Sequence, residues 1–382
     1  MPVVSEFCMR FDSTMHMARK RGLLTAGLVS VVLAWDVFAE DQLSDSRAAA
    51  ALFNETCISN GFWTGVAMIV GTPEKVLFRQ AWGWIDREKT VPMPVDAIFD
   101  LASVTKAVGA TTALAICMDR NLINPDSVFT NYLPGYTGTL QGPVTVRDLA
   151  RHISGFDNSK AYDREGQVTN LILELNPVRP VGAKYCYSCA NFILLGMIVE
   201  NVSGKNLADF CHENIFEPLG MKDTRWAPLP NPDPRRVVRQ AVTQTFGVAS
   251  DPPARNANHP VGNAGLFSTV DDLGLFCRMM LSGGKSGEKR IISETMMRTL
   301  GVRPDELSPA SFGWRVDPEY NPPSLSGGTM SHTGWAGNSV WIDPICRRYV
   351  VVLSNRMGEN AKVAKARKEL AEFVLQAMKN VE

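Results

Sequence analysis

The chain has 382 residues, of which 45% are hydrophobic and 20% are charged, which is the composition of an ordinary globular protein. Its 39 Lys and Arg residues balance 39 Asp and Glu residues, so no net charge favours a nucleic acid or an acidic surface as partner. A small molecule or a peptide is the expected substrate, and the length suffices for one large domain or two.

The N-terminal segment has the order of a secretory signal. Residues 19–21 are basic, residues 22–35 carry no charge and are mostly apolar, and Ala39 is a small residue at a cleavage position. The apolar run is shorter than the roughly 20 residues that span a bilayer. We therefore predict a signal peptide over residues 1–39, with Met17 as a candidate for the true start, and a secreted or periplasmic mature chain without a stable membrane span. An uncleaved membrane anchor is the alternative.

The first elements of the mature chain are predicted to be a helix and a β-hairpin. Residues 48–60 have a helical pattern. Two apolar runs, at residues 65–71 and 75–82, are joined by a turn that contains Pro73, and this pattern predicts two antiparallel strands. A long segment from residue 103 to residue 121 then has apolar residues at helical spacing, which predicts a central, buried helix.

Helices dominate the middle of the chain and strands return near its end. A loop over 228–262 is rich in Pro, Asn and Arg and is expected to border an active site. Strands at both ends predict an α+β fold, with a mainly antiparallel sheet built from both chain ends, flanked by helices. We expect one domain over 40–382 with a helical region inserted at about 116–284. The further helices are predicted at 145–152, 191–202, 207–214, 268–281 and 362–378, and the further strands at 312–316, 339–342 and 349–354.

Ser103 and Lys106 are the first candidate catalytic pair. Positions i and i+3 of a helix lie on one face, so Lys106 can reach the Ser103 hydroxyl if the helix begins there. A serine needs a neighbouring base to become a nucleophile, and a lysine serves as that base only if its pKa falls below about 10.4. Taken alone, the motif is more often chance, with Ser103 a helix cap and Lys106 a solvated residue.

Two other features allow more than one interpretation. His152 ends a short predicted helix and could be a catalytic base, but a lone histidine at a helix end is more often structural. Cys186 and Cys189 form a C-x-x-C motif, which could be a disulfide. Without a second ligand pair, the motif is weak evidence for zinc, and we predict neither a metal nor a cofactor.

Two distant stretches could converge on Ser103. One runs from Lys184 to Gly196 and contains Tyr187. The other contains His332-Thr333-Gly334 and leads into a strand that ends at Asp343. Considered singly, Tyr187 would be a core tyrosine and His332 a loop residue.

Together, the three stretches resemble the serine β-lactamase and penicillin-binding-protein superfamily. The branch that they most resemble contains the class C β-lactamases, the D-alanyl-D-alanine carboxypeptidases and the β-lactamase-like esterases. The similarity spans roughly residues 50 to 375 with the motifs in the same order. Supporting segments lie at 99–102, 149–155, 264–269 and 353–356.

The resemblance implies a role for each residue. Ser103 would be the acylated nucleophile, Lys106 would share its proton, and Tyr187 would act as a phenolate or proton relay. His332, Thr333 and Gly334 would fill the Lys-Thr-Gly position on an edge strand. The backbone N–H groups of Ser103 and Trp335 would form the oxyanion hole.

Two departures from the family pattern bear on the substrate. Cys189 stands where the Tyr-x-Asn element has its amide, which weakens the case for recognition of a β-lactam or peptide amide. His332 stands where many members have lysine, and a histidine is mostly neutral at pH 7, so it is a weaker anchor for a carboxylate. Both changes favour an ester.

We therefore predict a serine hydrolase that forms an acyl-enzyme on Ser103 and acts on small esters, D-amino-acid peptides or β-lactams, with esters ranked first. A Gly-x-Ser-x-Gly element is absent from the sequence, which argues against an α/β-hydrolase. The alternative from another class is a non-catalytic protein of the same fold that binds cell-wall peptides.

Overall fold

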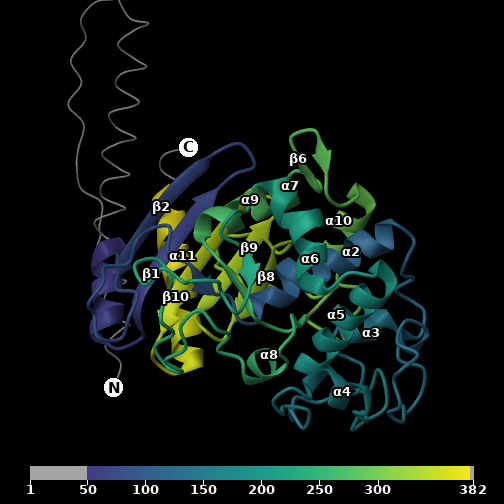
Figure 1. The fold of residues 1–382 in the computed structure, drawn as a ribbon. Coiled ribbons are helices and arrows are strands. Elements are labelled where there is room, and N and C mark those ends of the chain that lie inside the picture. The colour runs from purple at the N-terminus through teal and green to yellow at the C-terminus, as the bar shows by residue number, and fades with distance from the viewer. Residues whose placement is uncertain (1–49, 379–382) are drawn as a thin grey trace, which may run out of the picture.

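The computed structural model describes residues 50–378, and its centre is a five-stranded antiparallel sheet in the order β2-β1-β10-β9-β8. Strands from the two ends of the chain meet in it, as the sequence predicts (Figure 1). β1 pairs with β10 from Val66 opposite Ser354 to Gly71 opposite Tyr349. The strands are β1 (Trp63–Gly71), β2 (Val76–Gly83), β8 (Met330–Gly334), β9 (Asn338–Asp343) and β10 (Arg348–Arg356).

Both faces of this sheet are covered, which explains why every residue of β1 is buried. Alternate residues of β1 point to opposite faces: Met68 packs toward α11 (Asn360–Met378), and Ile69 packs toward the core that includes α9 (Val270–Leu281). The helix over residues 50–59 lies on the α11 side. The result is a sheet between two layers of helices.

The helical region lies beside the open edge of the sheet, next to β8 (Figure 1). A small second sheet has the strand order β3-β5-β4. The predicted subregion 116–284 contains most of these helices. Its elements and their neighbours are β3 (Phe99–Asp100), η1 (Lys106–Thr111), α2 (Thr112–Asp119), η2 (Phe129–Asn131), α3 (Val146–Ala150), α4 (Val168–Leu173), α5 (Cys189–Ser203), α6 (Leu207–Cys211), η3 (His212–Phe216), α7 (Glu217–Leu219), β4 (Arg225–Trp226), α8 (Pro252–Asn256), β5 (Leu266–Ser268), β6 (Lys285–Ser286), β7 (Lys289–Arg290), α10 (Glu294–Gly301) and η4 (Pro318–Tyr320).

Local sequence signals set several helix starts. Thr145 and Asp148 form a reciprocal capping box at α3, in which each side chain accepts a bond from the other residue's backbone N–H. Thr269 caps α9 by accepting from the N–H of Asp272. Both caps fall where the sequence predicts a helix start.

The strand predicted at 312–316 is wrong. Only Arg315 makes β-bridges there, to Ala310 and Ser331. Gly313 has a φ of +74°, which takes the backbone out of the extended region. The buried ring of Trp314 gives the segment an apolar pattern without a strand.

Two sequence predictions concern membrane and export. None of the helices over residues 50–378 combines the length and hydrophobicity that crossing a bilayer requires. The signal peptide predicted at 1–39 lies outside the described residues.

Candidate active site

Ser103 lies in the tight turn that joins β3 to η1. The preceding residue, Ala102, has a φ of +45°, a left-handed conformation that alanine seldom adopts. The buried carboxylate of Asp100 holds this turn, because it accepts the N–H of Ala102 at 2.8 Å and that of Ser250 at 2.8 Å. Burial raises the pKa of Asp100 above its ordinary value, although the hydrogen bonds act against that rise.

Lys106 reaches Ser103 as the i, i+3 spacing predicts. Its Nζ lies 3.1 Å from the Ser103 Oγ and donates to the Asn263 carbonyl oxygen at 2.7 Å. The side chain is fully buried. Asn263 directly follows the loop predicted at 228–262.

The pKa of Lys106 does not meet the condition that a lysine must satisfy to act as a neutral base. Burial lowers it, but Cys189 and Tyr187 outweigh burial, because in their anionic forms they stabilise the ammonium. The net result is a pKa raised above the ordinary value. Lys106 is therefore better suited to stabilising a negative charge beside it than to taking a proton as a neutral amine.

Tyr187 approaches the serine from the other side. Its Oη lies 2.8 Å from the Ser103 Oγ, and the Lys106 Nζ lies 5.1 Å from the centre of its ring. The serine hydroxyl thus has an ammonium and a phenol within hydrogen-bond distance. A phenolate beside a lysine ammonium could accept the serine proton.

Cys189 is the first residue of α5 and lies in the same cluster. Its Sγ is 3.7 Å from the Lys106 Nζ. Its backbone N–H donates to the Oδ1 of Asn158 at 3.1 Å, so an amide that the sequence prediction missed lies next to this position. Cys186 and Cys189 are both free thiols, and the disulfide alternative is not realised.

β8 supplies the edge strand that the sequence predicts. His332 is buried on it, and its Nδ1 lies 3.0 Å from the Thr333 carbonyl oxygen. Burial, together with the charges of Arg315 and Lys106, lowers the pKa of His332 well below its usual range. The imidazole is therefore neutral at pH 7.

Gly334 brings the end of β8 against the serine turn. A Cβ at this position would lie 2.4 Å from the Leu101 carbonyl oxygen, so only glycine allows the approach. Asn338, at the start of β9, donates through Nδ2 to the Asp100 carbonyl oxygen at 2.7 Å. These contacts fix the β8–β9 turn, which contains Trp335, to the turn that contains Ser103.

Two backbone donors are left open at this junction. Among residues 50–378, the N–H groups of Ser103 and Trp335 have no hydrogen-bond acceptor. The Arg356 guanidinium lies 3.9 Å from the centre of the Trp335 ring, and the Arg356 N–H donates to the Ala336 carbonyl oxygen at 3.1 Å. Arg356 thus holds the β8–β9 turn in place, while the N–H of Trp335 can bind an oxygen atom.

Arg315 is a further charged residue that the sequence prediction missed. Its Nη1 lies 3.4 Å from the Thr333 Oγ1, and its guanidinium lies 4.4 Å from the centre of the Tyr320 ring. A cation therefore stands beside β8 although His332 is neutral. No local signal marked Arg315, because only the bridge to Ser331 brings it there.

His152, for which the sequence left a structural and a catalytic interpretation open, lies beside the site. It is buried, and its ring centre lies 4.7 Å from that of Tyr187. No hydrogen bond joins it to Ser103 or Lys106.

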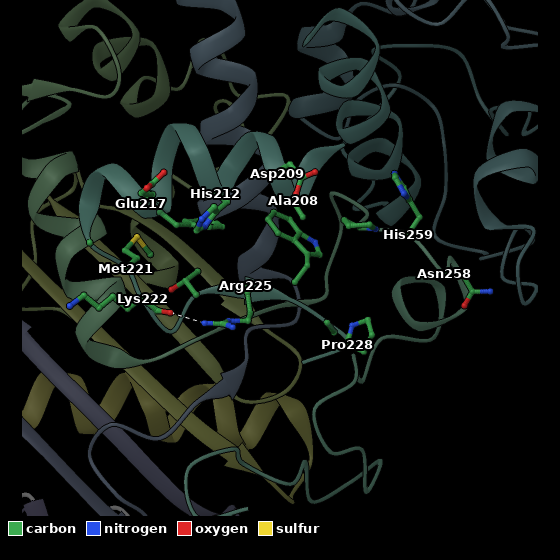
Figure 2. A pocket seen from close by; sticks show the side chains of 16 residues that line it. Ala208, Asp209, His212, Glu217, Met221, Lys222, Arg225, Pro228, Asn258 and His259 are labelled. Carbon is green, nitrogen blue, oxygen red and sulfur yellow. Dashed lines mark hydrogen bonds between the residues drawn. The ribbon is translucent and has the colours of Figure 1, made fainter. Parts of the chain in front are cut away.

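A cavity of about 790 Å³ lies elsewhere, between α6, η3, α7, β4 and residues 258–260. Figure 2 shows its labelled side chains, which include His212, Arg225 and His259. None of the predicted site residues lines it. The catalytic candidates therefore form a separate cluster at the junction of β8, η1 and α5.

Comparison with known proteins agrees with the family resemblance of the sequence motifs. The family model described as Beta-lactamase matches residues 56–375. Two curated relatives from Escherichia coli, from O157:H7 and from strain K12, are each named "Putative D-alanyl-D-alanine carboxypeptidase". They are 27% and 28% identical over 398 residues, which covers 88% of this chain and 91% of each relative.

Solved structures share the fold at low sequence identity. One is EstCE1, "a hydrolase with promiscuous acyltransferase activity", with a TM-score of 0.71, 21% identity and coverage of 89% of this chain and 99% of that chain. Another is a penicillin-binding-protein homologue from Caulobacter crescentus, with a TM-score of 0.68, 20% identity and coverage of 86% and 98%. A family VIII carboxylesterase has a TM-score of 0.66, 19% identity and coverage of 87% and 97%.

Proposed function

This chain belongs to the Beta-lactamase family, and from that premise we propose that it is a serine hydrolase that forms a covalent acyl-enzyme on Ser103. One observation carries the proposal: the Ser103 Oγ lies within 3.1 Å of the Lys106 Nζ and within 2.8 Å of the Tyr187 Oη. A nucleophile and a base at hydrogen-bond distance are what acyl transfer needs.

In the acylation step, Tyr187 as phenolate takes the proton of Ser103, while Lys106 remains an ammonium and stabilises the phenolate. The Oγ attacks the carbonyl carbon, and the resulting oxyanion accepts hydrogen bonds from the N–H groups of Ser103 and Trp335. Losing one such donor costs about 3 kcal/mol of barrier lowering in other enzymes. Tyr187 then returns its proton to the leaving group as the carbonyl re-forms.

Deacylation repeats the same sequence with water. Tyr187 takes a proton from the water molecule, the hydroxide attacks the acyl carbon, and the Ser103 Oγ leaves with the proton. The carboxylic acid is released and the free enzyme is regenerated.

Three residues, which are Cys189, His332 and Arg315, support the substrate class that we propose. Cys189 offers a thiol in place of an amide, and His332 is neutral, so a small ester ranks ahead of a D-amino-acid peptide or a β-lactam. Arg315 adds a cation near Thr333, which favours a substrate with a carboxylate. We propose a small, carboxylate-bearing ester or peptide, encountered outside the cytoplasm because residues 1–39 have the pattern of a secretory signal.

Labelling with a fluorescent fluorophosphonate tests the acyl-enzyme. Wild type should be labelled, Ser103→Ala should not, and Ser159→Ala, which changes an exposed serine, should be labelled like wild type. A panel of nitrophenyl esters, nitrocefin and a D-Ala-D-Ala peptide then ranks the substrates. A wild type that stays unlabelled under conditions that label a penicillin-binding relative would leave the non-catalytic binding protein as the better interpretation.

A further inference from the structure

His152 occupies an unusual place next to the catalytic cluster. It follows α3 with a φ of +59°, in the left-handed region where Asn, Asp and His are enriched several-fold among non-glycine residues. Its side chain is 3% exposed. His152 is thus buried in a backbone conformation that few residues adopt, and its contacts indicate what it does there.

Those contacts fall on both neighbours of Tyr187. The backbone carbonyl oxygen of His152 accepts the N–H of Cys186 at 2.8 Å. The imidazole Nδ1 accepts the N–H of Ser188 at 3.1 Å. One residue thus fixes the backbone immediately before and immediately after the tyrosine.

The protonation state of the imidazole follows from its donors. The Ser188 N–H can only donate, so the Nδ1 must carry a lone pair. The Asn191 Nδ2 is 3.1 Å from the same Nδ1, and the Asn191 Oδ1 accepts the Ser154 hydroxyl at 2.6 Å, which orients the amide with its NH₂ toward His152. His152 is therefore a neutral imidazole with its proton on Nε2.

The ring of His152 also contacts the ring of Tyr187. Their centres are 4.7 Å apart at an angle of 37°, and the Phe192 ring lies 5.2 Å from His152. Tyr187 is thus held through its backbone on both sides and through its ring, which leaves its Oη directed at Ser103 at 2.8 Å.

We propose that His152 is a positioning residue that fixes Tyr187 against Ser103, an inference that rests on the proposed function. It forms no hydrogen bond with the nucleophile and transfers no proton. Its task is to hold a phenol whose placement sets the acylation rate, since a misplacement of about 1 Å can cost about 100-fold.

Two variants test the side chain while the backbone bond to Cys186 stays. His152→Asn keeps an acceptor at the δ position but loses the ring, and His152→Gly loses both, so their comparison isolates the acceptor; both residues tolerate a positive φ. We expect the acylation rate constant, measured by stopped-flow with p-nitrophenyl acetate, to stay within about 5-fold of wild type in the Asn variant. In the Gly variant it should fall by about 100-fold with little change in substrate affinity.

The pH profile separates positioning from a general loss of structure. The ionisable or charged groups around His152 and Tyr187 are Lys106, Arg315, His332, Tyr185, Tyr162 and Cys189. If His152 positions Tyr187 beside Lys106, then the pH at which the acylation rate rises or falls should shift in the Gly variant. In the Asn variant that pH should stay as in wild type. A variant that only lowers the folded fraction would scale the rate and leave the profile in place.

The controls distinguish this inference from the proposed function. If wild type forms no acyl-enzyme, then the proposed function fails first. If wild type reacts and Tyr187→Phe does not, then a folded Gly variant with the wild-type rate and profile overturns the positioning role alone. Should the Gly variant not fold by near-UV circular dichroism, then the Asn variant decides: a loss as large as that of Tyr187→Phe overturns the proposal.

Discussion

At the residue scale, a neutral imidazole and a guanidinium share the place beside Thr333. His332 is buried and uncharged, whereas Arg315 brings its Nη1 to 3.4 Å from the Thr333 Oγ1. A planar guanidinium can hold a carboxylate through two parallel bonds. We therefore propose that the charge for substrate binding comes from Arg315, which lies outside the His-Thr-Gly motif.

Arg315→Gln should therefore weaken the binding of carboxylate-bearing substrates. A hydrogen bond to a charged group is worth about 1.5–3 kcal/mol, which predicts a KM about 10-fold to 100-fold higher for a nitrophenyl hemisuccinate. The neutral nitrophenyl acetate is the control and should be hydrolysed as by wild type. Equal losses on both esters would contradict a carboxylate-binding role.

Cys189 is the second residue that we expect to influence the choice of substrate. Cys189→Asn should place an amide next to Lys106 and raise the acylation rate with nitrocefin or a D-Ala-D-Ala peptide by about 5-fold relative to an ester, as expected for one hydrogen bond of about 1 kcal/mol. Cys186→Asn, which changes the half-buried partner of the motif, is the matched control. A Cys189→Asn variant with an unchanged ratio of rates would argue that the thiol does not select the substrate.

At the element scale, β8 and the serine turn are in backbone contact. A methyl group at Gly334 would meet the Leu101 carbonyl oxygen at 2.4 Å, so Gly334→Ala must push the strand away from the nucleophile. We expect kcat to fall by about 100-fold with the protein still folded. Gly301→Ala, in α10, meets nothing closer than the Met330 Sδ at 3.6 Å and should retain activity, as measured on the same ester; a fully active Gly334→Ala would contradict the contact.

The same scale shows which features can be predicted from sequence. The β1–β2 hairpin, the capped start of α3 and the helix after Ser103 arise from local patterns, and they are confirmed. The failed strand at 312–316 had the right apolar pattern but contained Gly313. Arg315 and Asn158 could not be found, because their places depend on a bridge to Ser331 and on a bond to Cys189 that join distant segments.

The pKa of Lys106 shows a second limit of prediction from sequence. The spacing of Ser103 and Lys106 predicts their contact, which the structure confirms at 3.1 Å. The direction of the Lys106 pKa depends on Cys189 and Tyr187, which arrive from far along the chain. The motif therefore predicts which atoms are in contact. The pKa of Lys106 cannot be predicted from it, because that pKa depends on residues that only the fold brings close.

At the scale of the whole molecule, α11 places a charge inside the core. Arg367 is 1% exposed, and its Nε donates to the Ser339 Oγ at 3.0 Å. Among residues 50–378, no carboxylate lies within 4 Å of it, and its Nη1 has no acceptor. Burial, helped by repulsion from Arg356, lowers the pKa of Arg367 to about 9, so below that pH the unfolded chain holds this proton more tightly and the charge destabilises the fold.

Arg367→Met should stabilise the protein at pH 7. Replacing buried ion pairs by apolar side chains of similar volume often stabilises other proteins, by up to about 4 kcal/mol, and a guanidinium without a carboxylate partner should gain at least as readily. Urea denaturation measures the change. Arg298→Met, on the exposed side of α10, should stay within about 0.5 kcal/mol of wild type. A destabilised Arg367→Met variant would show that the guanidinium is paired in solution.

The pairing of β1 with β10 has a consequence for how the chain reaches this fold. β10 is the middle strand of the sheet although it is the last to be synthesised. Until it is available, β1–β2 and β8–β9 are two separate ribbons, each with an unpaired apolar edge that can associate with other chains. The large separation in sequence between the partners predicts slow, late folding, so a polypeptide that stops before Arg348 should aggregate rather than fold in part.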